Sequence, residues 1–394
     1  MIHDVHAALT SGGYEVFLLF GANEEWEFDP PDFDYTWLKQ ADLQYIQAAS
    51  VLGMKAFVIN RLLSPSFDKY PHIHYMWFAR ASQGLVSHFE VCVSVGAISL
   101  VSLPLAIAGK SHISWIATLY RDELQGKTLS DQGDRAANEL LNNSCWKNIE
   151  RLERYAYEKT SLIFPLSEYT AQRIHNVHSI DSRRIGDVLY PPIDTAMFNS
   201  SNRSLIGSPH ETQIEILCAA RINDPRKNIR MLMQAMLYLR PEFSVKLLLV
   251  GEEPNSSLRE LCKQLQLTDI VNFLGEWPRE QLVQLYKKAH VFVLPSIQEG
   301  LGIVVLEAMS CGLPVVTTTS GGPEHIVKVS EAGIVCPISD EALATSLRSL
   351  IQNQALWLEL SRNGRTFVEH NLRWSGFSER ILTTIDRTSR AGTE

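Results

Sequence analysis

Pro295–Ser320 reads PSIQEGLGIVVLEAMSCGLPVVTTTS. The apolar run His290–Pro295 predicts a strand that ends where this stretch begins, and the two glycines of Glu-Gly-Leu-Gly predict a loop. We expect a helix from about Gly302 to Cys311 and a further strand over Pro314–Thr319. A strand, a loop, a helix and a strand in this order predict one unit of a parallel α/β sheet.

The same alternation of apolar runs and helical stretches continues in both directions along the chain. The other predicted strands are Tyr14–Phe20, Met54–Asn60, Phe89–Val95, His112–Leu119, Ser161–Leu166, Ile214–Ala220, Ser244–Val250 and Ile270–Leu274. Between the halves, Asn199–Thr212 (NSSNRSLIGSPHET) is polar, rich in turn residues and without apolar period, which predicts a linker. The sequence thus predicts two doubly wound α/β domains, over 1–198 and from 213 onward, that face each other across a cleft.

The composition is that of an ordinary globular protein. The 394 residues carry a net charge of −8, which gives no field for binding nucleic acid. The six cysteines are scattered and form no Cys-x-x-Cys pair, so we expect buried thiols in a reducing compartment. The N-terminal residues lack the apolar core of a signal peptide, and we expect a cytoplasmic protein.

One stretch imitates a membrane span. Val91–Gly109 is uncharged and close to the ~20 residues that cross a bilayer. Its three serines, two glycines and Pro104 favour a buried strand followed by a buried helix, with a membrane span as the alternative.

Two carboxylates stand at the predicted helix of the opening stretch. Glu307 lies within a run that is apolar almost all round, so this carboxylate must find partners inside the protein. Glu299 precedes the helix, where Gly300 and Gly302 leave backbone N–H groups open to an anion. This arrangement suits a ligand with hydroxyls on both sides of a diphosphate, a nucleotide sugar. The alternative is structural, with Glu299 as a helix cap and Glu307 paired with an arginine.

A pair of cations follows another strand. Arg221 and Lys227 stand between the predicted strand Ile214–Ala220 and the amphipathic helix predicted over Ile229–Leu239. Positive charges at a helix N-terminus oppose the helix dipole unless they hold an anion. We therefore expect the guanidinium and the ammonium to bind one diphosphate.

These residues resemble a known family. Glu299-Gly-Leu-Gly-Ile-Val-Val-Leu-Glu307 is similar to the E-x7-E motif of the retaining GT-B glycosyltransferases, particularly glycosyltransferase family 4. Arg221 and Lys227 fall where that family has its diphosphate-binding pair. Three further segments resemble its C-terminal domain, namely Leu249–Gly251, Phe273–Gly275 and Gly321–Glu324. Val188–Asp194 resembles the end of its N-terminal domain, and Leu372–Phe377 resembles the segment that returns to that domain.

The resemblance implies a GT-B fold and a role for each matching position. The C-terminal domain would span 213–371, and residues 372–394 would return to the N-terminal domain. Glu299 would contact donor-sugar hydroxyls, and Glu307 would bind the ribose. The donor-binding set would be Arg221, Lys227, Glu276 near the base, Glu299, Gly300, Leu301, Gly302, Ile303 and Glu307.

The resemblance also implies the reaction. A hexose would move, with retention of configuration, from a UDP-sugar or GDP-mannose to a glycan or lipid-linked acceptor in polysaccharide or glycolipid synthesis. Of the two donors, we favour the UDP-sugar. Arg221 and Lys227 would neutralise the leaving diphosphate in place of a metal, and no cofactor is expected. Peripheral association with the inner membrane face would suit a lipid-linked acceptor.

The sequence departs from the family at two places. Tyr120 stands where the family has a histidine, and we expect it, with Asp122 nearby, to orient substrate rather than to take a proton. The alternative is an aromatic strand end followed by a solvated acidic turn. The family's first strand and glycine-rich loop have no counterpart ahead of the helix predicted at the N-terminus. We expect a start upstream of Met1, or another segment in that place, because their absence would leave neighbouring strands unpaired.

Other interpretations remain open. Asp32-Phe-Asp34 matches a metal motif of another glycosyltransferase fold, but its proline-rich surroundings favour a solvated loop. The rival functions are a GT-B sugar-nucleotide epimerase and a non-catalytic protein that binds nucleotide sugars.

Overall fold

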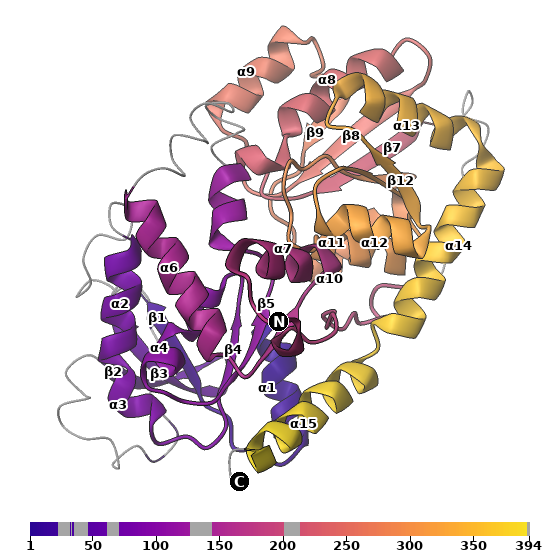
Figure 1. Cartoon of the computed structure of the whole chain (residues 1–394). Coiled ribbons are helices and arrows are strands. Elements are labelled where there is room, and N and C mark those ends of the chain that lie inside the picture. Colours follow the sequence, from indigo (N-terminus) through magenta and orange to yellow (C-terminus); the bar gives the residue numbers. More distant parts are fainter. Residues whose placement is uncertain are drawn as a thin grey trace.

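The computed structural model describes residues 1–22, 32, 34, 46–60, 71–126, 144–200 and 213–391. Its strands form three sheets, two within residues 18–165 and one within residues 214–336. Figure 1 shows the C-terminal sheet and its helices as one lobe and the first six strands in the other. Most of the predicted linker Asn199–Thr212 lies outside the described residues.

The C-terminal lobe holds a six-stranded parallel sheet. Its order is β12-β11-β10-β7-β8-β9, with bounds β7 Ile214–Ala219, β8 Val245–Val250, β9 Val271–Phe273, β10 Val291–Leu294, β11 Val315–Thr318 and β12 Gly333–Cys336. Consecutive residues of a strand point to opposite faces. Ile216 and Cys218 therefore join one apolar core, and Leu217 and Ala219 join the other.

Helices cover both faces of this sheet. They are α8 (Ile229–Leu239), α9 (Ser256–Gln264), α10 (Arg279–Lys288), α11 (Ile303–Ser310), α12 (Gly322–Ser330), α13 (Asp340–Gln352) and α14 (Gln354–Asn371). Of these helices, α8, α9, α13 and α14 contribute residues to the core with Ile216, and α10, α11, α12 and α14 contribute residues to the core with Leu217, which also contains residues from outside this lobe. The predicted bounds of α8 are confirmed to the residue.

The N-terminal lobe is divided. One sheet has the order β1-β3-β2, from β1 (Leu18–Ala22), β2 (Ile46–Val51) and β3 (Met54–Asn60), with β2 antiparallel to β3. The other is parallel, in the order β4-β5-β6, from β4 (Val93–Gly96), β5 (Ile113–Ile116) and β6 (Leu162–Pro165). Among the described strands, β1 pairs with β3 alone and β4 with β5 alone.

The helices of this lobe are α1 (Ile2–Ser11), α2 (Pro71–Ala81), α3 (Gln83–Val86), α4 (Leu103–Ile107), α6 (Ser144–Lys159) and α7 (Glu168–His178). Short 3-10 turns lie at Ser99–Ser102 and Ser182–Arg184. Within Val91–Gly109 the chain forms β4, a turn and α4, as the buried alternative predicts. Across the described ranges, no helix is long and apolar enough to span a membrane.

The last helix returns to the N-terminal lobe. α15 (Trp374–Ala391) runs beside α1 (Figure 1). The ring of Phe377 packs at a tilt against the buried Trp115, with centroids 5.1 Å apart, and Arg380 donates a 2.9 Å bond to the carbonyl of Val188. The chain therefore crosses between the lobes twice.

Two sequence predictions need correction. The first strand begins at Leu18 rather than Tyr14, because the Tyr14 N–H caps α1 by bonding to the carbonyl of Leu9 at 3.1 Å. β2 and β12 were not predicted at all. Five of the cysteines are free and buried as expected, namely Cys92, Cys218, Cys262, Cys311 and Cys336.

Candidate functional site

The candidate site lies where two loops meet at the carboxyl ends of β7 and β10. These neighbouring strands are the point at which the strand order reverses, the usual ligand position in open α/β sheets. The loop after β7 ends in a 3-10 turn over Pro225–Lys227, and the loop after β10 spans residues 295–302. The Ile297 N–H bonds to the Arg226 carbonyl at 2.7 Å, so the backbone holds the loops together.

Lys227 and Glu299 form an ion pair across these loops. The Lys227 ammonium donates to Glu299 Oε1, which also accepts a 3.0 Å bond from the Ser296 hydroxyl. The two side chains are only 12% and 13% exposed. A partly buried pair is screened less by salt than a surface pair. The structure therefore brings together two of the predicted site residues.

The glycine loop continues into α11. Gly302 is the N-cap of this helix in the left-handed conformation, at φ 75°, which favours glycine. Leu301 is buried in the core, and Ile303 begins the helix. The Val305 N–H bonds to the carbonyl of the N-cap Gly302 at 2.9 Å, and a helix offers no acceptor of its own to the N–H groups that come before it. They are the donors that the sequence predicts for a phosphate.

Glu307 lies on the buried side of α11 and faces α10. Its Oε1 accepts a 3.1 Å bond from Arg279, and its Oε2 accepts a 3.2 Å bond from the Tyr286 hydroxyl. Burial raises the pKa of the Glu307 carboxyl, while Arg279 and Tyr286 act in the opposite direction. Arg279 supplies the arginine partner of the structural alternative. It is half exposed and lies over the ring of Phe198.

The loop after β7 carries two arginines, Arg221 and Arg226, which differ in exposure and in their partners. Arg221 is 63% exposed and pairs with Asp224 at 3.0 Å. Arg226, which sequence reasoning missed, is buried; it pairs with Asp224 at 2.7 Å and with Glu123 of the N-terminal lobe at 3.3 Å. Its place beside Lys227 in Asp-Pro-Arg-Lys was the available signal. Arg221 and Lys227 thus lie on the same loop, with Lys227 the more enclosed.

The two lobes touch at the glycine loop. The Gln298 amide donates a 3.1 Å bond to the Thr118 hydroxyl, and the Ser167 hydroxyl donates a 2.6 Å bond to the Gly300 carbonyl. A Cβ at Gly300 would overlap the carbonyl oxygen of Ala117. Gly300 therefore permits a close approach between lobes, and the candidate site lies at their junction.

Tyr120 follows β5 at this junction but turns its ring toward α6. The ring stacks on Trp146 with centroids 5.8 Å apart, and the Tyr120 N–H donates a 2.9 Å bond to the fully buried Glu153. Its neighbour Asp122 is buried and pairs with Arg173 at 2.5 Å, which differs from a solvated acidic turn. The substrate-orienting role of Tyr120 stays a prediction.

Glu276, expected near the base, is exposed beyond the end of β9. It follows Gly275, whose carbonyl accepts a 3.1 Å bond from the N–H of Gly251 at the end of β8. Elsewhere, Asp32 and Asp34 are exposed.

This geometry can be compared with known proteins. Residues 206–367 match the family model described as Glycosyl transferases group 1. This segment is similar to the group 1 glycosyl transferases. The matched range contains the Lys227–Glu299 pair and Glu307, together with the six strands of the C-terminal sheet.

Relatives and solved structures extend the comparison. The D-inositol 3-phosphate glycosyltransferase of Mycobacteroides abscessus is 29% identical over 231 residues, which cover 55% of this chain and 49% of that relative. The chain spans about half the length, or less, of the first curated relatives that it matches. Among solved structures, sucrose-phosphate synthase from Thermosynechococcus elongatus has a TM-score of 0.75 at 19% identity, covering 99% of this chain and 93% of that one.

A third match is the Anabaena protein HepE, solved in complex with UDP and glucose. It has a TM-score of 0.65 at 16% identity and covers 94% of this chain and 99% of that chain. These likenesses show that the C-terminal lobe and the lobe before it together have the GT-B glycosyltransferase fold.

Proposed function

We propose that the chain is a glycosyltransferase that moves a hexose from a nucleotide-diphosphate sugar to a hydroxyl of a glycan or lipid-linked acceptor. The observation that carries the proposal is the enclosed Lys227–Glu299 pair beside the N-terminus of α11, at the junction of the lobes. It combines a cation for the phosphates, a carboxylate for sugar hydroxyls and backbone donors for an anion. The match to the group 1 family supports the same function.

When the donor binds, its diphosphate would replace the Glu299 carboxylate as the anion paired with Lys227. In the structure the ammonium is neutralised by Glu299. A bound diphosphate would draw Lys227 away and leave Glu299 to accept hydrogen bonds from sugar hydroxyls. Arg221 is exposed at the start of the same loop, where its guanidinium would reach the diphosphate after leaving Asp224.

The chemistry follows from the charge that develops on the leaving group. As the bond between the sugar and the diphosphate lengthens, negative charge grows on the diphosphate oxygens. Lys227, Arg221 and the amides of residues 300–303 would stabilise that charge without a metal. The acceptor would attack from the side on which the diphosphate leaves, and a diphosphate oxygen would take its proton. Configuration at the anomeric carbon would be retained.

The nucleoside would lie along α11 and α10. Glu307 would accept bonds from the ribose hydroxyls, and the main chain near Glu276 would meet the base. We favour a UDP-sugar as donor because the structurally similar HepE is a complex with UDP and glucose, and GDP-mannose is the second choice. A lipid-linked acceptor would bring the protein into peripheral contact with a membrane.

Calorimetric titration tests the donor site. UDP-glucose, UDP-N-acetylglucosamine and GDP-mannose are titrated without divalent metal into the wild type, Lys227→Ala and Arg221→Ala. We expect one donor to bind, with at least about tenfold weaker binding in Lys227→Ala. Arg240→Ala is the matched control, because it removes an exposed positive charge at the other end of α8. Equal affinities in Lys227→Ala and Arg240→Ala would contradict the proposed site.

Assays of turnover distinguish a transferase from an epimerase and from a non-catalytic binding protein. Release of UDP that depends on an added acceptor supports a transferase. An epimeric sugar nucleotide formed without acceptor would assign an epimerase, and binding without any turnover would assign a non-catalytic protein.

A further inference from the structure

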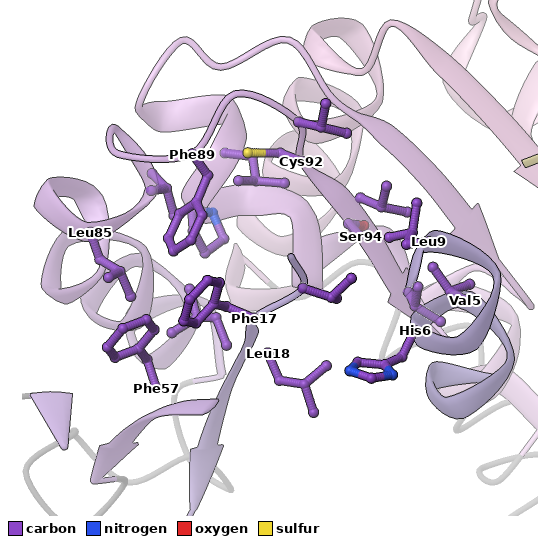
Figure 2. A pocket seen from close by; sticks show the side chains of 18 of the residues that line it. Val5, His6, Leu9, Phe17, Leu18, Phe57, Leu85, Phe89, Cys92 and Ser94 are labelled. Carbon is purple, nitrogen blue, oxygen red and sulfur yellow. The ribbon is translucent and has the colours of Figure 1, made fainter. Parts of the chain in front are cut away.

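Glu153 is a carboxylate without access to solvent. It lies on α6, and its side chain is 0% exposed. An ionised carboxylate inside a protein is costly unless a charge or hydrogen-bond donors meet it. Figure 2 shows the cavity of about 790 Å³ in this lobe, which Val5, Leu9 and Phe89 line and Glu153 does not. Packed protein groups, and not the wall of that cavity, therefore surround the Glu153 carboxylate.

The two oxygens of Glu153 have different partners. Oε1 accepts a 2.9 Å bond from the Tyr120 N–H, and the Ser99 hydroxyl lies 3.5 Å from it. Oε2 lies 3.5 Å from Nε2 of the buried His178, the last residue of α7. The His178 ring packs at a tilt against the fully buried Tyr157, with centroids 5.3 Å apart. Of these contacts, the bond from the Tyr120 backbone is the shortest.

Stability alone does not account for such a group. A buried ion pair contributes little to stability, because the cost of removing both charges from water offsets their attraction. A well-packed apolar residue in the same place is often neutral or stabilising. An apolar residue, however, cannot accept a hydrogen bond from the Tyr120 N–H. The carboxylate of Glu153 is therefore tied to the position of the Tyr120 backbone.

α6 contacts Tyr120 at two places. Trp146 and Glu153 lie about two turns apart on α6 and so share one face of the helix. Trp146 stacks on the Tyr120 ring, and Glu153 accepts the bond from the Tyr120 N–H. Rotatable bonds separate the ring from the main chain. The bond to Glu153 is therefore the contact that fixes the backbone itself.

Tyr120 stands in the middle of the segment that meets the other lobe. We call residues 117–123 the junction segment. Three of its residues approach or bond the loops of the candidate site. They are Ala117 beside Gly300, Thr118 bonded to Gln298, and Glu123 paired with Arg226. A shift of the Tyr120 backbone would disturb these contacts on both sides of it.

We propose that Glu153 is a positioning residue. It fixes the Tyr120 backbone and, through the junction segment, the placement of the N-terminal lobe against the Lys227–Glu299 pair. The inference rests on the proposed function, in which the donor binds to the C-terminal lobe and the acceptor meets it at the junction. A misplacement of about 1 Å caused by a residue far from the chemistry can cost about 10²-fold in rate. Donor binding uses the C-terminal loops and does not require Glu153.

Two substitutions separate positioning from folding. Glu153→Gln keeps an oxygen that accepts the Tyr120 bond, and Glu153→Leu removes the acceptor but fills the space. Glu158→Leu is the matched control, because Glu158 is an exposed acid on the same helix. For each variant, kcat, the KM for acceptor and the donor affinity are measured well below its melting temperature.

We expect kcat to fall about tenfold or more in Glu153→Leu, with donor affinity unchanged. Glu153→Gln should restore kcat toward the wild-type value, and Glu158→Leu should keep it. Lower melting temperatures with wild-type kcat in Glu153→Leu would overturn the proposal and leave a role in folding. A kcat in Glu153→Gln as low as in Glu153→Leu would also overturn it, because the accepted bond would not be the decisive contact.

A double-mutant cycle tests the route through the junction segment. Thr118→Val breaks the bond between the junction segment and Gln298. If both residues act on one placement of the lobes, the variant with Thr118→Val and Glu153→Leu loses little more kcat/KM than the more impaired single variant. Losses that multiply would show that Glu153 acts independently of this contact, and would overturn the proposed route.

Hydrogen exchange gives a readout that needs neither donor nor transfer. We expect the Tyr120 amide to exchange about tenfold faster or more in Glu153→Leu than in the wild type and Glu153→Gln, with amides of the C-terminal sheet unchanged. Equal exchange in the three proteins would overturn the proposal whatever their activity. A wild type that shows this exchange pattern but transfers no sugar would contradict the proposed function and support the anchoring of the junction segment by Glu153.

Discussion

The side-chain amide of Gln298 donates a 3.1 Å hydrogen bond to the hydroxyl of Thr118, which joins the loop after β10 to the N-terminal lobe. Both side chains are buried. Thr118→Val removes the acceptor but keeps the shape, at a cost of about 1–3 kcal/mol where Gln298 is left unsatisfied. We expect kcat/KM to fall about tenfold while donor affinity, set by the C-terminal lobe, changes little. A comparable loss of donor affinity in calorimetry would contradict this division.

Lys227 should dominate the electrostatic contribution to transfer. Lys227→Ala removes the charge nearest to the proposed diphosphate, and loss of one such group costs roughly 10²–10³ in kcat. Arg221 is far more exposed, and we expect a smaller effect from Arg221→Ala. Steady-state kinetics of both variants at saturating donor provide the comparison. The reverse ranking would move the diphosphate toward Arg221.

Even the addition of a methyl group at Gly300 should impair activity. Gly300→Ala places a Cβ against the Ala117 carbonyl, so the lobes must separate or the loop must shift. We expect kcat/KM to fall at least about tenfold, as for a misplacement of the reacting groups. Gly376→Ala in α15 is the control, because a Cβ there meets nothing within 4 Å. Kinetics of the two variants at matched thermal stability give the answer, and full activity in Gly300→Ala would show that the contact is dispensable.

Glu307 should make stability depend on pH. Burial raises its pKa in the folded protein, so the folded state binds its proton more tightly than the unfolded state. Its contribution is therefore present below the ordinary pKa of a glutamate and is lost as pH rises through the raised value. Thermal melts of wild type and Glu307→Gln at about pH 4.5 and pH 7.5 measure this. We expect the melting temperature of the wild type, measured relative to that of Glu307→Gln, to be higher at the lower pH than at the higher pH.

The exposed Glu359 provides the control for that experiment through Glu359→Gln. A difference between wild type and Glu307→Gln that is constant over this pH range would show that Arg279 and Tyr286 fully offset the burial.

The contributions of the Tyr120 ring and of its hydroxyl can be tested separately. Because the ring stacks on Trp146, we expect Tyr120→Ala to lower stability by about 3 kcal/mol and Tyr120→Phe to preserve it. Melting curves test the ring. The hydroxyl is tested by kcat/KM of Tyr120→Phe, which should fall if Tyr120 orients substrate; an unchanged value would confine Tyr120 to packing.

Periodicity predicted the parts of the fold whose sequence carries its own signals. α8 matches its prediction because an amphipathic face begins after Asn228 and ends at Leu239. β2 was missed because its turn to β3 is made by Leu52 and Gly53, both at positive φ. Leucine rarely adopts that conformation, so the usual asparagine–glycine signal of such a turn is absent.

The site was predictable where one short segment carries the chemistry. Glu299 and Lys227 could be named from local patterns, and the structure joins them across seventy-two positions. Arg279 and Gln298 could not be assigned their roles, nor could Arg226 be paired with Glu123, because these partners lie on other elements and no local period connects them. Contacts between lobes depend on tertiary structure that periodicity does not encode.

The packing of Phe377 against Trp115 has a consequence for the order of events during synthesis. Domains usually fold as they leave the ribosome, the N-terminal one first. Here a side chain from α15 completes a core that β5 began more than half a chain earlier. At ~5–20 residues per second, the N-terminal lobe waits for tens of seconds before that side chain emerges. In the meantime its apolar surface is exposed to chaperones, and a nascent chain stalled before α15 should be sensitive to protease.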